Sequence, residues 1–489
     1  MRTVAGLSVL FCMLIGSSCS REQAVKQMPV SGLPCLYISL PDGEETLLNK
    51  DKNRKTGGSF CLTDAVGDTV CSDTFKYIKG RGNDTWTLPK KPYTLRLSDT
   101  VSLLGMSASK RYYLLANAKD RSNLRNAVAL DASRKFGLGG AEYAFVSLFI
   151  NGTCKGVYQL TNASKDQYTS RPHGNGDRLI YISGYEESAD FVSQARVAVE
   201  VKYPEHLSKP QTDSVAAFYN EFEQAVMAAD GRNPFTGRHY STMIDMPSFA
   251  VYYLLQEIFL NQDAGAGSVY MCLSSAPSPR LYAGALWDFD LSMGNPHCTF
   301  QCRVPQVIWA ANGRKEKEGT SAGLLYYLCR HSDFNASVDS IYTRSFSATL
   351  RQSVSETYER NKALLADPEC AGGAQSLAGF LQQRADYMDW LYLSEDRKVR
   401  LDAVFNRGIL DNKTVQIYVP YNTPVQLPQP QLTGLNFARW HYAGSGKRVE
   451  QNSVFTADTS IELRWSGVRE IYSRLYVFYK SLSEKRSQD

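Results

Sequence analysis

This chain of 489 residues has little excess of either sign of charge and few long apolar segments. Lys and Arg number 54 against 49 Asp and Glu, and a net charge of +5 over this length does not indicate a nucleic-acid-binding surface. No segment after the N-terminus offers the ~18 consecutive apolar residues that a membrane-spanning helix needs. We therefore expect no nucleic-acid partner and no later transmembrane helix, and other partners have to be inferred from sites.

The first 19 residues have the order of an export signal. Arg2 precedes an apolar run at 9–15, and small residues at 16–18 lead to Cys19. This order resembles a bacterial lipobox, in which the cysteine becomes the lipidated first residue of the mature protein, although Gly16 stands where the pattern prefers Leu. We interpret 1–19 as a lipoprotein signal with lipidation at Cys19; plain secretion or an uncleaved anchor is the alternative.

A polar stretch without periodicity, 20–32, is predicted to tether the lipid to the folded part. The lipid would attach the protein to a membrane of the bacterial cell envelope, on either the periplasmic or the surface-exposed side. The residues directly after Cys19 lack the acidic run that some bacteria use for surface export, which favours the periplasmic face.

Nine cysteines follow the signal, an odd number in a compartment that permits disulfides, so at least one is unpaired or bonded elsewhere. Cys61 and Cys71 are close enough in sequence to form a bridge, as are Cys298 and Cys302, but spacing alone does not determine connectivity. His297 beside Cys298 suggests metal, yet no second ligand pair at the spacing of a zinc site follows. Buried or bridged thiols are therefore favoured over zinc.

The pattern of apolar residues predicts two large parts. Short strand-like runs fill 33–165, with one helix that follows the capping residues Asp120–Ser122 and ends at Gly137. Helical periodicity dominates 166–400, above all at 248–260, where apolar side chains surround most of the helix and predict burial. A β-rich part followed by an α-rich part predicts an α+β fold of two lobes that meet at a ligand-binding cleft. Further helices are predicted at 213–226, 320–329, 336–365 and 375–393.

Strand-like runs with Pro and Gly breaks return at 406–470 and predict a small all-β module, followed by a tail at 471–489. Its frame resembles the Listeria-Bacteroides repeat, a β module of surface proteins that usually acts as a spacer or adhesive unit. The spaced aromatic residues of this frame suit a small core. The frame consists of Thr423–Pro428, Gly434–Trp440 and Asp458–Trp465.

Carboxylates follow two apolar segments in the second half of the chain. Asn261–Asp263 stands at the end of the buried helix, and Trp287–Asp290 supplies two more aspartates, of which Asp288 follows Asp263 by 25 residues. Buried carboxylates are costly without a cation or donors, so convergence on a hard divalent metal would explain them. Phosphoryl transfer uses such a set, with one carboxylate as proton acceptor and another on magnesium. The alternative is that these aspartates cap a helix and a turn.

A basic, glycine-containing segment lies in the first half. The turn Lys79–Trp86 leads into a strand at Pro89–Leu97. Glycines let backbone amides approach a phosphate, while Lys and Arg supply charge. The alternative is an ordinary solvated edge strand.

Together these segments resemble the CotH kinase family from about Pro34 to about Leu393, in the family's own order. Five such elements in sequence are not expected by chance. They are R-G-N-S-T-W with P-K-K-P-Y at Arg81–Tyr93, L-L-A-N…D…L-R-N at Leu114–Asn126, N-G-x-x-x-G-x-Y at Asn151–Tyr158, N-x-D at Asn261–Asp263 and W-D-F-D at Trp287–Asp290.

The resemblance implies a kinase-like bilobal fold that binds ATP with a divalent metal, Mg²⁺ or alternatively Mn²⁺ or Ca²⁺, and phosphorylates protein hydroxyls. Carried over by position, Asp263 is the catalytic base and Asp288 a magnesium ligand. Asp290 is a second ligand or a structural carboxylate. Asn261 orients Asp263 or the metal.

For the nucleotide phosphates the first choice is Lys91, and the further candidates are Lys79, Lys90, Arg81 and Arg96. Two other residues of the matching elements are expected to be structural. Asn83 stands beside glycines, where an amide often fastens a turn, and Arg125 is in a helix, where an Arg more often pairs with a carboxylate.

One position departs from the family pattern, because Asn162 stands where the family commonly has Glu in Y-x-L-x-E. We weigh two functions. The first is an exported kinase that phosphorylates Ser or Thr of envelope or extracellular proteins. The second is a catalytically silent adhesin or binding module, which the neutral Asn162 and the scarcity of ATP outside the cytoplasm favour. Metal-dependent hydrolysis is less favoured because no His ligand accompanies the carboxylates.

Overall fold

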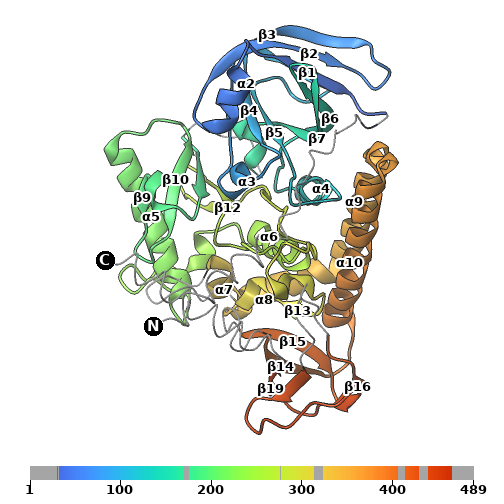
Figure 1. Cartoon of the computed structure of the whole chain (residues 1–489). Helices are drawn as coiled ribbons and strands as arrows, with labels where there is room; N and C mark the ends of the chain where they lie inside the picture. Colours follow the sequence, from blue (N-terminus) through green and yellow to red (C-terminus); the bar gives the residue numbers. More distant parts are fainter. Residues whose placement is uncertain are drawn as a thin grey trace, which may run out of the picture.

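The computed structural model describes residues 30, 32–169, 174, 176–275, 277–312, 323–405, 414–428 and 439–464. The predicted signal with Cys19, the tether up to residue 29 and the tail at 471–489 lie outside these residues. Within them, no helix combines the length and apolar character that crossing a membrane requires. The described chain is a mixed α/β structure, in which Figure 1 shows a barrel above a group of helices and a further sheet below them.

A closed barrel forms the first part of the chain. Its neighbouring strands are antiparallel, except that β1 and β6 run parallel. Successive side chains point to opposite faces, so Leu95 and Tyr112 enter the barrel core while Arg96 and Arg111 point outward. In barrel order the strands are β1 (Cys35–Ser39), β2 (Thr56–Thr63), β3 (Thr69–Gly80), β4 (Tyr93–Val101), β5 (Ser109–Leu115), β7 (Thr153–Asn162) and β6 (Tyr143–Ile150).

Three helices accompany the barrel: α2 (Glu44–Lys50), α3 (Asp84–Thr87) and α4 (Arg125–Lys135). Helix α4 confirms the helix predicted in this part. Asp120 accepts a hydrogen bond from the backbone N–H of Arg125 (2.9 Å), and Ser122 accepts one from that of Leu124 (3.1 Å). Gly137 follows the helix with a φ of +79°, the left-handed conformation that commonly ends helices.

Residues 166–400 are rich in helix, as predicted, and they also contain a five-stranded sheet that the sequence pattern did not predict. Its strand order is β12-β11-β8-β10-β9. Strands β8 and β11 pair although they are far apart in sequence, so no local turn signal marks the sheet. The strands are β8 (Arg178–Ile182), β9 (Phe191–Val192), β10 (Ala198–Tyr203), β11 (Val269–Leu273) and β12 (Leu281–Ala283).

The helices of this part lie near their predicted positions. Helix α5 begins earlier than expected because Ser208 and Gln211 form a capping box in front of it. The segment predicted as one helix at 336–365 is two, joined by a π-helical turn at Tyr342–Phe346. The helices are α5 (Lys209–Met227), α6 (Met246–Ile258), α7 (Leu324–Leu328), α8 (Ser332–Ile341), α9 (Ser347–Arg360) and α10 (Pro368–Leu393).

Helix α6 is buried, as its sequence predicts, and it carries a buried charge. The Glu257 carboxylate pairs with Arg384 of α10 at 2.8 Å, and both side chains are 0% exposed. The same carboxylate accepts hydrogen bonds from the backbone N–H groups of Trp309 and Ala310, both at 2.8 Å. Glu257 therefore joins α6, α10 and the 309–310 turn.

A five-stranded sheet closes the described chain, in the order β13-β15-β14-β19-β17, with β16 and β18 paired beside it. The sheet begins before the predicted boundary at 406, and it includes β13 from the helical part of the chain. Its core contains Trp309, Phe405 and Trp440. Parts of the predicted module, 406–413, 429–438 and 465–470, lie outside the described residues. The strands are β13 (Val307–Ile308), β14 (Lys398–Val404), β15 (Thr414–Pro420), β16 (Pro424–Val425), β17 (Arg439–Tyr442), β18 (Ser453–Val454) and β19 (Thr459–Arg464).

The cysteine pairs that we considered for bridges are unbonded. Cys61 and Cys71 lie on β2 and β3 but face Ser72 and Leu62 respectively, so they do not oppose one another. Cys298 and Cys302 are buried thiols in the core of the C-terminal sheet. The thiol of Cys298 donates a hydrogen bond to the carbonyl of Ser292 at 3.7 Å.

We predict that Arg384→Met lowers the free energy of unfolding by about 3–5 kcal/mol, because it leaves the Glu257 charge buried without its cation. Chemical denaturation measures the loss. The control is Arg121→Met, whose ion pair with Glu369 is 3.6 Å long between side chains that are 78% and 72% exposed, and which should cost about 0–1 kcal/mol. Equal effects of the two substitutions would contradict the assigned role of the buried pair.

Candidate active site

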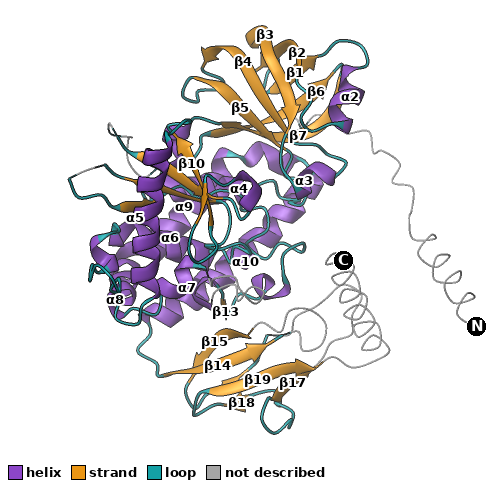
Figure 2. Ribbon diagram, turned by 90° about the vertical axis from the view of Figure 1, so that its left-hand side faces the viewer, coloured by secondary structure: helices purple, strands orange, loops and turns teal. Residues whose placement is uncertain are grey.

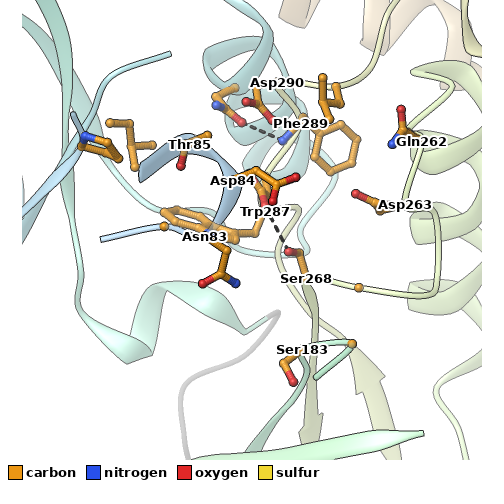
Figure 3. A pocket seen from close by; sticks show the side chains of 18 of the residues that line it. Asn83, Asp84, Thr85, Ser183, Gln262, Asp263, Ser268, Trp287, Phe289 and Asp290 are labelled. Carbon is orange, nitrogen blue, oxygen red and sulfur yellow. Dashed lines mark hydrogen bonds between the residues drawn. The ribbon is translucent and has the colours of Figure 1, made fainter. Parts of the chain in front are cut away.

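A cleft of about 580 Å³ lies where the barrel meets the rest of the chain. Its walls come from the ends of elements: the turn after β3 at 81–85, the segment after β5 that includes Lys119, the loop after β8 at 183–185, the turn after α6 at 262–268 and the segment after β12 at 286–291. Figure 3 shows Gln262 and Asp263 on the side of the cleft away from Asn83 and Thr85. Side chains from distant parts of the sequence therefore face one space.

The three predicted carboxylates, Asp263, Asp288 and Asp290, all line this cleft. Asp288 reaches solvent in the cleft, yet enclosure by the surrounding protein raises its pKa, and the nearby charge of Asp263 raises it further. Burial raises the pKa of Asp290 to about 7, and the charge of Asp288 adds to this. The charges of these carboxylates are thus close enough to repel one another, at a wall where Asp290 is buried and Asp288 is exposed to the cleft.

The backbone that carries these aspartates is held in an uncommon conformation. Asp288 has a φ of +67°, a region that non-glycine residues rarely adopt. The next N–H, of Phe289, donates to the Asn126 side chain of α4 at 2.7 Å, and the Ser268 hydroxyl donates to Asp288 at 3.4 Å (Figure 3). These contacts fix where the Asp288 carboxylate points.

Asn261 does not line the cleft and is 2% exposed. Its Oδ1 accepts a hydrogen bond from the backbone N–H of Asp263 (3.2 Å), and its Nδ2 donates to Gln256 (3.0 Å). Of the two roles expected for it, this geometry corresponds to orienting Asp263. Because both polar groups of the side chain are engaged and buried, our assignment of Asn261 as a metal ligand is corrected.

The cations of the cleft are Arg81 and Lys119. The Arg81 guanidinium stands over the ring of Tyr113, 4.0 Å from its centroid, and 5.7 Å from that of Trp287. The charges of Arg81 and Lys119 both lower the pKa of Asp288, so they lie close to the carboxylates. Lys119 was missed from the sequence because it lies between two matching residues and outside any basic run.

No three His, Cys, Asp or Glu side chains in the described ranges come close enough to hold a metal ion by themselves. This does not conflict with a magnesium site of the phosphotransfer type. Mg²⁺ is usually bound through one or two carboxylates, with water and substrate phosphates as the other ligands. Two neighbouring carboxylates, Asp288 and Asp290, offer the oxygen donors that fit such an ion.

Residues 78–388, well over half of the chain, match the sequence model of a family described as CotH kinase protein. The chain belongs to the CotH kinase family. A search of solved structures finds the crystal structure of the Helicobacter pylori proinflammatory kinase CtkA, with 10% identity, covering 60% of this chain and 90% of that chain. Its TM-score of 0.31 is too low to support an argument about fold. Curated protein sequences give no match.

The P-K-K-P element of the CotH kinase family does not place its lysines in the cleft. Lys91, our first choice for the phosphates, donates to the carbonyl of Trp86 at 2.6 Å. Lys90 donates to the carbonyl of Val157 at 2.6 Å, and burial lowers its pKa to about 8. Neither residue lines the cleft, and both corrections have one cause: the chain from Trp86 to Pro92 folds back onto the barrel, where carbonyls bind the two amines.

Lys79 and Arg96, the other two candidates for phosphate binding, also lie outside the cleft lining. Strands β3 and β4 carry them on the outer face of the barrel, where Lys79 is opposite Thr94 and Arg96 is opposite Tyr77. Of the five predicted cations, the structure therefore brings only Arg81 to the carboxylates.

Asn162, the residue at which this CotH chain departs from the family pattern, also lies outside the cleft. The Asn162 side chain donates to the carbonyl of Ser107 at 2.5 Å and accepts from the N–H of Ser164 at 2.8 Å. It is fully buried at the end of β7. The neutral residue at this position serves a turn, so it does not remove a carboxylate from the cleft.

Arg125 and Asn83 have the structural contacts expected of them. Arg125 forms a buried ion pair with Asp120 and donates to the carbonyl of Ser292 at 3.1 Å. It thereby ties α4 to the segment that follows the W-D-F-D element. Asn83 accepts from Lys52 at 3.3 Å, and the same amine donates to the carbonyl of Gly82 at 3.0 Å, which fastens the glycine turn.

We predict that Arg125→Met costs about 3–5 kcal/mol, since it leaves Asp120 buried and unpaired. Chemical denaturation gives the size of the loss, and amide hydrogen exchange of Phe289 and its neighbours should accelerate because the 288–293 segment loses its tie to α4. Lys135→Met on the same helix, which breaks a partly exposed pair with Glu356, is the control and should cost about 0–1 kcal/mol. Unchanged exchange at Phe289 would argue against this coupling.

Proposed function

We propose that this chain is an exported protein kinase of the CotH type, with a two-lobed kinase-like domain, which transfers the γ-phosphate of Mg-ATP to Ser or Thr hydroxyls of envelope or extracellular proteins. A kinase family in general implies ATP, a divalent metal and a protein substrate. The observation that carries the finer proposal is the meeting of Asp263 and Asp288, from two separate segments, in one cleft with Arg81 and Lys119.

Asp263 is the proposed catalytic base. It lies in the turn after the buried helix α6, lines the cleft and has its backbone N–H held by Asn261. A carboxylate held in this way accepts the proton of the acceptor hydroxyl as that oxygen bonds to phosphorus. The rigid helix behind the turn keeps the position of the carboxylate constant, which is what a proton acceptor needs for repeated alignment with a substrate.

Asp288 and Asp290 are the proposed holders of the divalent ion. When bound, such an ion neutralises charge on the phosphates. The two side chains fit this role because their mutual repulsion is relieved by a divalent cation and because carboxylate oxygens are preferred ligands of Mg²⁺. The strained backbone at Asp288, held by Asn126 and Ser268, sets the direction of its oxygens.

Arg81 and Lys119 are the proposed phosphate-binding cations. The guanidinium of Arg81 is held by the rings of Tyr113 and Trp287, so little freedom is lost when it binds an anion. Lys119 contributes a second positive charge near Asp288 and Asp290. Together they would balance phosphate charge that the aspartates alone would repel.

The cellular setting is part of the proposal. The lipobox-like order at 1–19 supports a lipid anchor at Cys19 and a place in the bacterial cell envelope. The aromatic frame of the C-terminal sheet supports a spacer of the Listeria-Bacteroides type between the kinase domain and its surroundings. A lipid-tethered kinase would meet envelope proteins at short range.

We predict that Asp288→Asn abolishes phosphoryl transfer and that Asp263→Asn lowers kcat by about 10²–10⁴ while nucleotide binding is retained. Transfer from γ-labelled ATP with Mg²⁺ or Mn²⁺ measures the first effect, and titration calorimetry with Mg-ATP measures binding. Asp213→Asn, at an exposed carboxylate of α5, is the control. If wild type binds no nucleotide, the domain is instead a silent binding module; equal labelling by wild type and Asp288→Asn would remove Asp288 from the mechanism.

We further predict that Arg81→Met weakens Mg-ATP binding by about tenfold or more, since it removes a charge-assisted contact to phosphate. Lys91→Met should bind as wild type does, because the Lys91 amine already bonds to the Trp86 carbonyl outside the cleft. Calorimetry on both variants decides between them. A larger loss in Lys91→Met than in Arg81→Met would restore the assignment made from the sequence.

A further inference from the structure

The outer face of the barrel carries a row of cations beside the cleft. The register of β3, β4 and β5 places Tyr77 opposite Arg96 and Arg96 opposite Arg111. One row nearer the cleft, Lys79 is opposite Thr94, which is opposite Tyr113. Lys55 extends the first row, with its amine 5.1 Å from the centroid of the Tyr77 ring. We call Lys55, Lys79, Arg96 and Arg111 the basic strip.

The cations of this strip lie close enough to repel one another. Arg96 and Arg111 are directly opposed on neighbouring strands, where like charges are destabilising. Burial lowers the pKa of Lys79, and the charges of Lys55 and Arg111 lower it further. An arrangement of this kind is a cost to folding.

Carboxylates do not neutralise the strip in the part of the chain that the structure describes. None of the four cations forms an ion pair with a described residue. The charge of Arg111 does reach Glu205, but that carboxylate is bonded to Lys165 at 2.7 Å. The strip is therefore left with net positive charge, and neither the barrel core nor the cleft chemistry requires it.

The strip runs into the cleft. Tyr113 lies in the same row of the sheet as Lys79 of the strip. Its ring also holds Arg81, which lines the cleft beside the carboxylates. Strand β10 lies close to the barrel, because Lys165, which follows β7, donates a hydrogen bond to the carbonyl of Lys202 in β10. Figure 2 shows β10 below the side of the barrel formed by β4 and β5. A chain lying on the strip could thus place one of its residues in the cleft.

We propose that the basic strip binds an acidic peptide, so that the protein acceptor carries Asp or Glu residues on one side of the hydroxyl that enters the cleft. This proposal rests on the proposed kinase function and specifies its substrate class. Alternate side chains of an extended peptide are about 6.8 Å apart and share one face, while strands are about 4.8 Å apart. The two spacings differ by about 2 Å, which the long, flexible Arg and Lys side chains can span, so acidic residues at alternate positions would meet cations on successive strands.

The nucleotide is a less suitable occupant of this surface. The strip lies outside the cleft lining, whereas Arg81 and Lys119 already stand beside the carboxylates where phosphates are expected. A peptide also matches the size of the surface. The three strands of the strip are about 10 Å across, which about three residues of an extended peptide would span. The docking role is therefore separate from the phosphate-binding role of the cleft.

Binding is tested on the full chain carrying Asp263→Asn, in which transfer is slowed and nucleotide binding is expected to be retained. The probe is a fluorescent peptide with one Ser and Glu at alternate positions, and its match has Gln in place of each Glu. Fluorescence anisotropy at low salt should show binding of the Glu peptide, loss of affinity as salt rises and weak binding of the Gln peptide. The double variant R96Q/R111Q should bind the Glu peptide about tenfold more weakly.

The double variant K209Q/K362Q is the control, because it removes the same charge from exposed lysines elsewhere and should bind as the parent does. Equal affinity of R96Q/R111Q and the control would overturn the proposal. So would displacement of the peptide by Mg-ATP, which would make the strip part of the nucleotide site. Binding to vesicles of anionic phospholipid but not to the Glu peptide would show a membrane-facing surface instead.

Two further measurements separate this inference from the kinase proposal. Transfer to the Glu peptide by wild type and R96Q/R111Q should differ in KM and not in kcat; an unchanged KM would overturn docking alone, while peptide binding without any transfer would overturn the kinase proposal alone. The single variant R111Q should unfold at the same denaturant concentration as wild type or a higher one, since it relieves repulsion. A clear destabilisation would show that Arg111 has a structural partner.

Discussion

Three aspartates that repel one another line one cleft, and much of the surrounding structure can be understood as holding them there. Asp263 and Asp288 come from different segments, and neither would stay beside the other without support. The support is local and specific: Asn261 holds the turn of Asp263, while Asn126 and Ser268 hold the strained segment of Asp288. Arg125 ties that segment to α4. Concentrated negative charge of this kind favours a divalent cation and phosphate chemistry.

The positive side of the site is divided between two places. Arg81 and Lys119 lie in the cleft, and the basic strip lies on the outer face of the barrel. Cations spread over a sheet face add an electrostatic field that can guide and orient an anionic partner, while cations held among aromatic rings act on a single group. This division is consistent with one surface for a protein acceptor and another for phosphates. Membership of the CotH kinase family implies ATP and a protein substrate only in general.

Much of the fold was accessible from the sequence because it depends on local periodicity. Helix α4 between its capping residues and Gly137, the buried helix α6 and the α8–α10 region follow from spacing that the chain itself displays. The five-stranded sheet that contains β8 and β11 was missed, because its strands pair across a large sequence separation. The start of the C-terminal sheet was displaced for a similar reason, since β13 joins it from the helical part.

For the site, the sequence by itself indicated which carboxylates come together in the cleft, because Asp263, Asp288 and Asp290 follow apolar segments and stand in recognisable family elements. Only the tertiary structure decided which cations face them. Lys90 and Lys91 are conspicuous in the sequence, yet their amines bind carbonyls of Val157 and Trp86, whereas the less conspicuous Lys119 lines the cleft. The physical reason is that a long, flexible side chain goes to whichever acceptor the folded backbone places within its reach, and sequence order does not encode that position.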